Sequence, residues 1–374
     1  MEMYFVKNWY CKPLKDDAIY GAEWAGTSDP SWVRTDAAVG FANPNPYYAG
    51  MSTTPSSPFD NIMPWSGMRR VTDANAGELV EIPKFYYKWT RNGSAMKLQI
   101  SMTAFDGSHV SPAHMDRGDG VGERDYVYVG RYHCSSSNYK SASGVKPKAS
   151  ITRATSRTAI HNLGSNVWQF DFALWWTINM LYLVEFANWN SQACIGYGCG
   201  NNSSTENSGA SDTMPYHTGT MKTSRTTYGV GVQYRYIEDY WANVNDYVDG
   251  IYYNQGYSYC INNPANFSDT SNGTQVSSSR DTSTAFLTIT TWNIPNIPGY
   301  EYALTPSGYT SFTDVSYTTD LYYGYGIGVV QNTGGNYTHN QIYGMFTWLA
   351  GDHASYSAQS IGSRLMVLPS QRIS

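Results

Sequence analysis

The stretch that decides the fold is Asp171–Trp189, which reads DFALWWTINMLYLVEFANW. Its large apolar side chains recur at the three- and four-residue spacing of an α-helix, at Phe172, Trp175, Trp176, Met180, Leu183, Val184 and Ala187. The stretch is apolar on more than one side, whereas a surface helix keeps one polar face. We therefore predict a helix over residues 171–189 that lies buried beneath a β-sheet.

Upstream of this helix the pattern becomes that of strands. Leu79–Trp89 is aromatic-rich in its later half, Arg91–Ser94 has the composition of a hairpin turn, and Met96–Met102 pairs naturally as the returning strand. Asp125–Tyr132 is a further strand candidate. A second, shorter helix is expected over Ser150–Leu163, with Arg153, Arg157 and His161 on one side.

The rest of the chain reads as loops and short strands. The first 75 residues are rich in Trp, Pro, Ser and Asn and predict ordered loops pinned by aromatic side chains. From Asn190 onward strands and loops alternate, and the Ser-, Asn-, Gly- and Thr-rich stretches 198–211 and 262–280 predict exposed loops. The fold class is therefore α+β with few helices, small antiparallel sheets and long ordered loops.

The composition favours a binding protein over a charged or disordered chain. Only 14% of the 374 residues are charged, and the polar surface must come from Ser, Thr, Asn, Gly and 33 tyrosines. Disordered chains are poor in aromatics and rich in charge, which is the opposite balance. Tyr, Ser, Gly and Asn dominate paratopes, because Tyr supplies contact area at low entropic cost and the small residues supply adaptable hydrogen bonds.

Charge and hydropathy exclude several partners and compartments. A net charge of −5 argues against nucleic acid as a partner, because phosphate binding needs a basic face. No run of about 18 apolar residues is present, so we expect no membrane insertion. Met1–Tyr10 lacks the features of a signal peptide. Five cysteines do not suggest a disulfide framework, so we expect synthesis in a reducing cytoplasm, which suits a virion part released by lysis.

Two groups of possible metal-ligating side chains are more simply explained without a metal. Cys194 and Cys199 are compatible with a metal pair or a local disulfide, but no second Cys or His pair follows them, and free thiols are favoured. Asp116–Asp125 carries four carboxylates among glycines and is compatible with calcium. Its spacing does not match the familiar calcium loops, so a solvated turn is favoured. We expect no metal and no cofactor.

The sequence evidence for catalytic residues is as weak as the evidence for a metal site. Glu238 and Asp239 are a conceivable pair of glycosidase carboxylates, but their aromatic surroundings favour a structural role. The seven histidines are scattered, and no Ser-His-Asp or Cys-His set can be assembled by a spacing rule. No phosphate-binding or dinucleotide-binding glycine pattern occurs in a strand-to-helix setting. The chain is therefore predicted not to be an enzyme.

Several segments together resemble phage tail and prophage structural proteins of gut bacteria, some of which are target proteins of diversity-generating retroelements. The resemblance covers roughly residues 15–369 and is carried by the order of the segments Tyr20–Trp24, Ser56–Asn61, Pro64–Arg70, Val80–Tyr87, Val129–Tyr132, Leu181–Ile195, Tyr234–Trp241 and Ile361–Leu365. It implies a C-type-lectin-like fold of the branch shared with the formylglycine-generating enzyme. In that branch the closing Gly-x-Arg-Leu segment, here Gly362–Leu365, belongs to a core strand.

The same resemblance implies a domain division and argues against one activity. We expect residues 1–75 to pack as a loop-rich aromatic segment on a C-type-lectin-like ligand-binding domain, 76–374, with inserts near 198–211 and 262–320. The related enzymes use a cysteine pair near the C-terminus, and this chain has no cysteine after Cys260. Formylglycine-generating chemistry is therefore not expected.

The resemblance also implies where a ligand is held. In retroelement targets the diversified positions share one exposed face and precede the closing segment, which corresponds here to Gly334–Ser360. Residues of the types that diversified Asn codons reach are Tyr337, His339, Asn340, Tyr343, Thr347, Asp352, His353 and Tyr356. Trp348 lies outside this set and is added as an aromatic anchor. The plainer alternative is that the stretch is Tyr-rich surface like the rest of the chain.

The function implied is that of a receptor-binding protein at a phage tail tip, which binds a surface protein or glycan of the host bacterium. We expect a homo-oligomer on the virion, for example a trimer, because tail devices are symmetric. The alternatives are a diversified adhesin on a bacterial surface or secreted, a purely structural virion protein, and an enzyme such as a glycan depolymerase. For the last of these nothing in the chain identifies an acid and a base.

Overall fold

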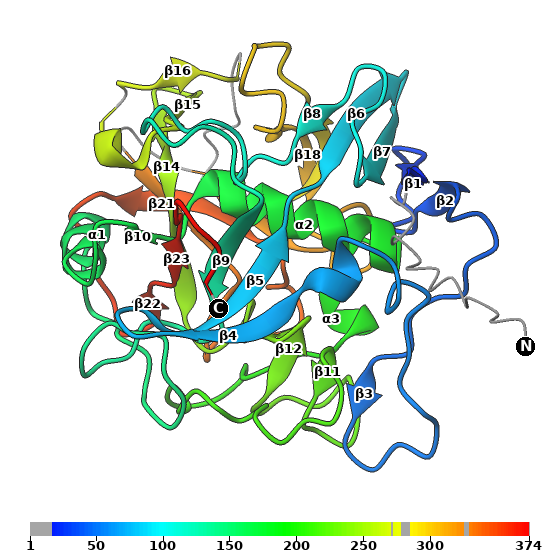
Figure 1. Cartoon of the computed structure of the whole chain (residues 1–374). Coiled ribbons are helices and arrows are strands. Elements are labelled where there is room, and N and C mark those ends of the chain that lie inside the picture. The colour runs from blue at the N-terminus through cyan, green and yellow to red at the C-terminus, as the bar shows by residue number, and fades with distance from the viewer. Residues whose placement is uncertain (1–16, 271, 278–284, 325–328, 374) are drawn as a thin grey trace, which may run out of the picture.

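The computed structural model describes residues 17–270, 272–277, 285–324 and 329–373. In these residues strands predominate and helices are few, so the predicted α+β class is confirmed at this level (Figure 1). The helices are α1 (Arg153–His161), α2 (Phe172–Phe186) and α3 (Ser191–Cys194), and single 3-10 turns occur at η1 (Trp65–Gly67) and η2 (Pro264–Asn266). None of the helices described is long and apolar enough to cross a bilayer.

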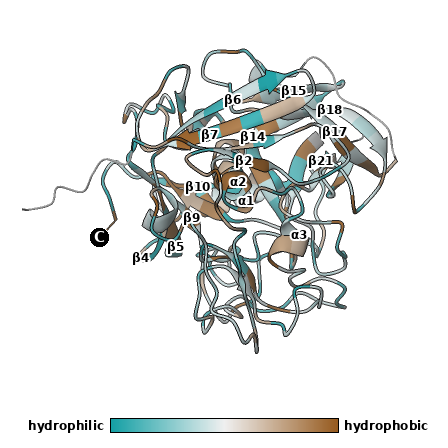
Figure 2. Cartoon of the chain, turned by 90° about the vertical axis from the view of Figure 1, so that its right-hand side faces the viewer, coloured by the Kyte–Doolittle hydropathy of each residue, from teal (hydrophilic) through white to brown (hydrophobic). Residues whose placement is uncertain are grey.

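Helix α2 is the centre of the molecule, as its sequence predicts. All 15 of its residues are buried. Asp171 caps its start by accepting a hydrogen bond from the Leu174 amide at 2.8 Å, and Ala187 ends it in the left-handed region at φ 50°. Figure 2 shows α2 in the middle of the molecule and coloured as largely hydrophobic. A helix that is apolar all round is stable only when protein surrounds it.

The first sheet lies against one side of α2. Its strand order is β2 (Val33–Asp36), β1 (Tyr20–Trp24), β7 (Ala95–Ser101), β6 (Tyr86–Asn92) and β8 (His109–Val110). The predicted hairpin is confirmed in β6 and β7, which pair antiparallel around a turn where Gly93 has φ 60°. Strands β1 and β7 contact α2 directly.

The second sheet contains the closing segment of the chain. Its order is β10 (Val167–Gln169), β23 (Leu365–Val367), β9 (Tyr126–Gly130), β5 (Gly77–Pro83) and β4 (Arg69–Asp73). Of the segment Gly362–Leu365, expected to belong to a core strand, Leu365 begins β23, which is fully buried between β10 and β9, whereas Gly362 ends β22 (Ile361–Gly362) and residues 363–364 lie between the two strands. The strand expected over Asp125–Tyr132 is β9.

Two further sheets complete the fold. A nine-stranded sheet comprises β16 (Thr274–Gln275), β15 (Tyr257–Cys260), β14 (Asn245–Asn254), β20 (Val329–Thr333), β21 (Trp348–His353), β19 (Leu321–Gly324), β17 (Leu287–Asn293) and β18 (Thr305–Ser311), with β22 (Ile361–Gly362) beside β14. A four-stranded sheet comprises β13 (Ile237–Glu238), β12 (Val232–Tyr234), β11 (Gly219–Thr220) and β3 (Tyr47–Tyr48). Residues 198–211 form no helix or strand, as expected of a loop. The loop expected over 262–280 is described at 262–270 and 272–277, where it contains η2 and the short strand β16, and its other residues lie outside the described ranges. Later in the expected insert 262–320, β17 and β18 form one edge of the large sheet.

The N-terminal segment shares its core with the rest of the chain. Strands β1 and β2 belong to the same sheet as β6–β8, and Trp24, Trp32 and Trp65 lie in one hydrophobic cluster with α2. The boundary expected at residue 75 falls in the turn of the β4–β5 hairpin. The described residues before and after this turn therefore bury one common core.

The arginine of the closing segment joins four parts of the fold. Arg364 is fully buried, and its guanidinium donates to the carbonyl oxygens of Gly130, Arg131, Glu238 and Asp239 at 2.9–3.0 Å. Its Nε atom also donates to the Asp246 carboxylate at 3.1 Å. The side chain thus ties β23 to the end of β9, to β13 and to β14.

Candidate functional site

The stretch predicted to hold the ligand, residues 334–360, leaves β20, passes through a loop, forms β21 and continues as a second loop to β22. Gly334 and Gly335 open the first loop with φ 83° and 68°. A Cβ atom on Gly335 would lie 2.4 Å from the Cβ atom of Tyr343, so glycine lets the loop fold back on itself. The stretch therefore presents two surface loops separated by one strand.

Two of the predicted ligand-binding residues, Thr347 and Trp348, lie in the core, and for them the prediction is wrong. Both are fully buried: Thr347 directly precedes β21 and Trp348 is its first residue, and β21 is flanked by β20 and β19. The Trp348 ring packs edge-on against Phe172 and Trp175 of α2, with centroid distances of 5.7 Å. A side chain enclosed between a sheet and the central helix has no access to a receptor.

The first loop brings together Tyr337, His339, Asn340 and Tyr343. The rings of His339 and Tyr343 stack at 3.5 Å with an interplanar angle of 13°. Asn340 is exposed, while the other three side chains are half-buried. Loop 198–211 braces this arrangement, because its Asn202 amide donates to the Tyr337 carbonyl oxygen at 2.7 Å and a similar bond holds His339.

The second loop carries Asp352, His353 and Tyr356. His353 and Tyr356 are exposed, Tyr356 by 46%. The Asp352 carboxylate is half-buried and accepts a hydrogen bond from Asn332 Nδ2 at 2.6 Å, and burial raises its pKa. Tyr247 fixes the loop by donating its hydroxyl to the Tyr356 carbonyl oxygen at 2.8 Å. These three residues remain available to a ligand at the surface.

A polar pocket lies where the two loops approach loop 198–211. It has a volume of about 260 Å³ and is lined by Lys146, Ala149, Ser150, Ser203, Ser204, Thr205, Tyr337 and Gln359. We call it the Tyr337 pocket. The Ser150 amide donates to the Ala358 carbonyl oxygen at 2.9 Å, which holds Gln359 beside residues 149–150. Of these lining residues only Tyr337 was predicted from the sequence. The others were hidden because they come from segments far apart in the chain.

The two cysteines and the carboxylate-rich loop show no ligand-binding arrangement. Cys194 and Cys199 are free thiols, as the sequence favours. In loop 116–125, Arg117 turns inward to a buried ion pair with Asp171, and Arg124 pairs with Asp119. Among the described residues no group of three or more His, Cys, Asp or Glu side chains is placed to hold a metal ion.

Glu238 and Asp239, the conceivable catalytic pair, are both buried. The Glu238 carboxylate accepts hydrogen bonds from the amides of Gly209 and Ser211 at 2.6 and 2.7 Å. Burial and the neighbouring Glu238 raise the pKa of Asp239 well above its ordinary value. The Asp239 carboxylate accepts a hydrogen bond from Asn243 Nδ2 at 3.1 Å, so both carboxylates are buried and bonded within the protein.

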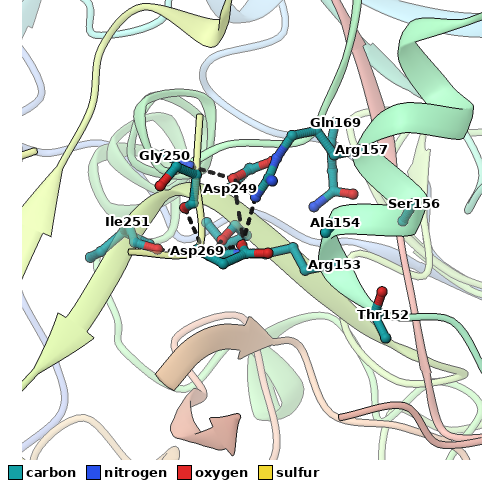
Figure 3. Close-up of polar contacts among 12 residues, drawn as sticks. Thr152, Arg153, Ala154, Ser156, Arg157, Gln169, Asp249, Gly250, Ile251 and Asp269 are labelled. Atoms are coloured by element: carbon teal, nitrogen blue, oxygen red, sulfur yellow. Dashed lines mark hydrogen bonds and ion pairs between the residues drawn. The ribbon is translucent and has the colours of Figure 1, made fainter. Parts of the chain in front are cut away.

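A cluster of four charged side chains beside α1 is also structural. Figure 3 shows Arg153 and Arg157 of α1 pointing toward Asp249 and Asp269. Arg157 Nη2 lies 2.9 Å from Asp249 Oδ1 and 2.7 Å from Asp269 Oδ1, and Arg153 Nη1 donates to the carbonyls of Val248 and Ile251. Two cations face two anions, so the cluster neutralises itself. It attaches α1 to β14 and leaves no charge unpaired for a ligand.

Acidification is expected to loosen the first loop through His339. Burial lowers the pKa of His339 to about 4, and its Nδ1 atom accepts a hydrogen bond from the Asn336 amide at 3.2 Å. The unfolded chain binds a proton near pH 6.5 but the folded chain only near pH 4, so stability falls as pH drops through this window. Thermal unfolding between pH 7 and 4 should show a smaller loss of Tm in His339→Gln, whose amide oxygen still accepts the bond. Equal losses in both proteins would contradict this role.

Neither a family model nor a curated protein matches the chain.

Proposed function

We propose that this chain is a non-enzymatic receptor-binding protein of a phage or prophage tail, built on a C-type-lectin-like domain. It binds a surface protein or glycan of the host bacterium through the exposed parts of residues 334–360. The observation that carries the proposal is the Tyr337 pocket, which unites Tyr337 and Gln359 of this stretch with hydroxyl groups from loop 198–211.

The chemistry of the pocket suits recognition. The Tyr337 ring offers a flat apolar face, Ser203, Ser204 and Thr205 offer hydroxyl groups, and Gln359 offers an amide. Such groups form adaptable hydrogen bonds around an aromatic anchor. No carboxylate is among the lining residues that the structure describes, so the pocket lacks the acid–base pair of most glycoside hydrolases.

The pocket is also held in place before a ligand arrives. The Tyr337 amide donates to the Asn243 carbonyl oxygen at 2.9 Å, and its own carbonyl oxygen accepts from Asn202. The backbone N–H and C=O groups of Tyr337 are therefore both hydrogen-bonded to neighbouring segments. Pre-organisation lowers the entropy lost on binding, which matters when each contact is weak.

Display on a virion would compensate for modest affinity at each site. We infer a symmetric homo-oligomer at the tail tip, such as a trimer, in which several pockets engage one cell. Once one pocket is bound, the others meet the same surface at a high effective concentration, so overall avidity exceeds single-site affinity.

Removal of the Tyr337 ring should abolish most of the binding to host cells. The chain is fused at its N-terminus to a fluorescent protein and applied to a panel of cultured gut bacteria, with staining measured by flow cytometry. We expect wild type to stain a subset of strains, and Tyr337→Ala to bind these strains roughly 10- to 30-fold more weakly, the loss typical of an aromatic anchor.

The matched control is Tyr86→Ala, which removes another half-buried tyrosine, from β6 in the first sheet. This variant should stain the same strains as wild type. Absence of staining across the whole panel, or equal staining by Tyr337→Ala and wild type, would contradict the proposed function.

A further inference from the structure

A second pocket, remote in sequence from residues 334–360, shares no lining residue with the Tyr337 pocket. It has a volume of about 290 Å³, and its wall includes Trp32, Asn43, Phe186, Asn188 and Arg225. We call it the Arg225 pocket. Its volume lies at the lower end of the range for ligand sites, which corresponds to a single small molecule or one sugar residue.

The charge of this pocket is positive and uncompensated. Arg225 forms no ion pair with any carboxylate in the described ranges, and its Nη2 atom donates instead to Asn45 Oδ1 at 3.1 Å and the Pro46 carbonyl oxygen at 3.0 Å. Its Nε atom is buried and has no partner among the described residues. A buried donor without an acceptor costs free energy of folding. A ligand atom that accepts its hydrogen bond would therefore bind favourably here.

A second guanidinium stands behind the pocket wall. Arg34 donates to Asn43 Oδ1 at 2.8 Å and to the Glu185 carbonyl oxygen at 2.6 Å, and it too has no ion pair in the part of the chain described. The Glu185 carboxylate is already occupied by Arg235 at 2.7 Å. Burial raises the pKa of the Cys194 thiol, which lines the pocket and therefore stays neutral. One positive charge thus lines the pocket and a second lies behind its wall, in a chain whose net charge is −5.

The other lining residues supply apolar surface and hydrogen-bonding groups that could contact the ring of a bound ligand. Trp32 and Phe186 are each 5% exposed and provide an apolar surface, while the Trp32 Nε1 donor is buried without a partner among the described residues. Asn43 and Asn188 add side-chain amides. Aromatic rings that carry one polar group suit ligands that are apolar on one face and wet on the other.

We propose that the Arg225 pocket binds the carboxylate-bearing residue of an acidic sugar, such as a uronic acid. The planar guanidinium of Arg225 matches a carboxylate, the Trp32 ring covers one face of the sugar, and the amides meet its hydroxyl groups. This site is independent of the proposed function, because it requires neither the Tyr337 pocket nor a bacterial surface.

The test is a titration of the full chain with glucuronate, followed by saturation-transfer NMR. Glucuronate is expected to bind in the millimolar range, while glucose, which lacks the carboxylate, gives no signal at the same concentrations. Arg225→Gln should weaken glucuronate binding at least 10-fold. Arg70→Gln is the control, because it removes an arginine that is exposed and lies outside this pocket.

A second variant tests the pocket independently, in case Arg225→Gln does not fold. Ala193 is exposed and lines the pocket, so Ala193→Leu fills the space without removing a native hydrogen bond, and it should also abolish binding. Equal binding of glucose and glucuronate, unchanged binding by both pocket variants, or saturation by inorganic phosphate with no response to glucuronate would each overturn the proposal. None of these outcomes depends on whether the chain stains bacteria.

Discussion

Replacement of Arg364 by methionine is expected to lower the free energy of unfolding by about 3–5 kcal/mol, the range seen when one partner of a buried ion pair is removed. Methionine preserves much of the side-chain volume but donates no hydrogen bond. Four buried carbonyl oxygens that Arg364 now serves would lose their donor. Asp246 would also lose its cation, although burial already raises the pKa of this carboxyl to about 6.

Urea unfolding followed by circular dichroism measures this loss. The matched control is Arg372→Met, because Arg372 is 48% exposed and its buried partner Glu81 keeps a second ion pair, with Arg69 at 3.0 Å. That variant should lose no more than about 1 kcal/mol, because the removed arginine is solvated and Glu81 retains Arg69 as its cation. A loss at position 364 as small as the loss at 372 would show that the buried arginine does not hold the sheets together.

The second large effect is expected at Trp348, which was predicted to be a ligand anchor and instead lies in the core. Trp348→Ala should destabilise the chain by about 3–5 kcal/mol, because it leaves a large cavity in a packed interior. The ring contacts α2 and also packs against Trp292, with a centroid distance of 5.8 Å. Loss of the ring would therefore weaken packing both in α2 and in the large sheet.

Thermal unfolding of Trp348→Ala and Tyr356→Ala separates core from surface within one stretch of sequence. Tyr356 is 46% exposed, so its truncation should change stability by less than about 0.5 kcal/mol. A stable Trp348→Ala variant that has lost its binding to cells would instead restore Trp348 as a ligand contact.

Local patterns in the sequence predicted the elements whose stability is local. Helix α2 follows from apolar spacing, and the β6–β7 hairpin follows from Asn92-Gly93 between two strands. The buried strand β23 overlaps only at Leu365 with the segment Gly362–Leu365 that the family resemblance assigns to a core strand. Its burial depends on Arg364 reaching carbonyl groups more than 100 residues away, which no local pattern contains.

The candidate site was predicted only in part, for two physical reasons. The family resemblance implies one exposed face over residues 334–360, but β21 enters the large sheet at Trp348 and buries this residue together with the preceding Thr347. The Tyr337 pocket was missed because Lys146, Ser203 and Gln359 meet only in the folded chain. Their residue types, a cation, a hydroxyl and an amide, are common on any surface and carry no signal of their own.

The most direct test of the central claim is a mutational scan of residues 334–360, in which every variant is displayed on yeast and sorted for folding and for capture of a host strain that wild type stains. The account predicts that substitutions at exposed or half-buried Tyr337, His353, Tyr356 and Gln359 reduce capture while the chain stays folded. Substitutions at Thr347 and Trp348 should reduce both together. If no position in this stretch separated capture from folding, the receptor would bind elsewhere on the molecule and the central claim would be wrong.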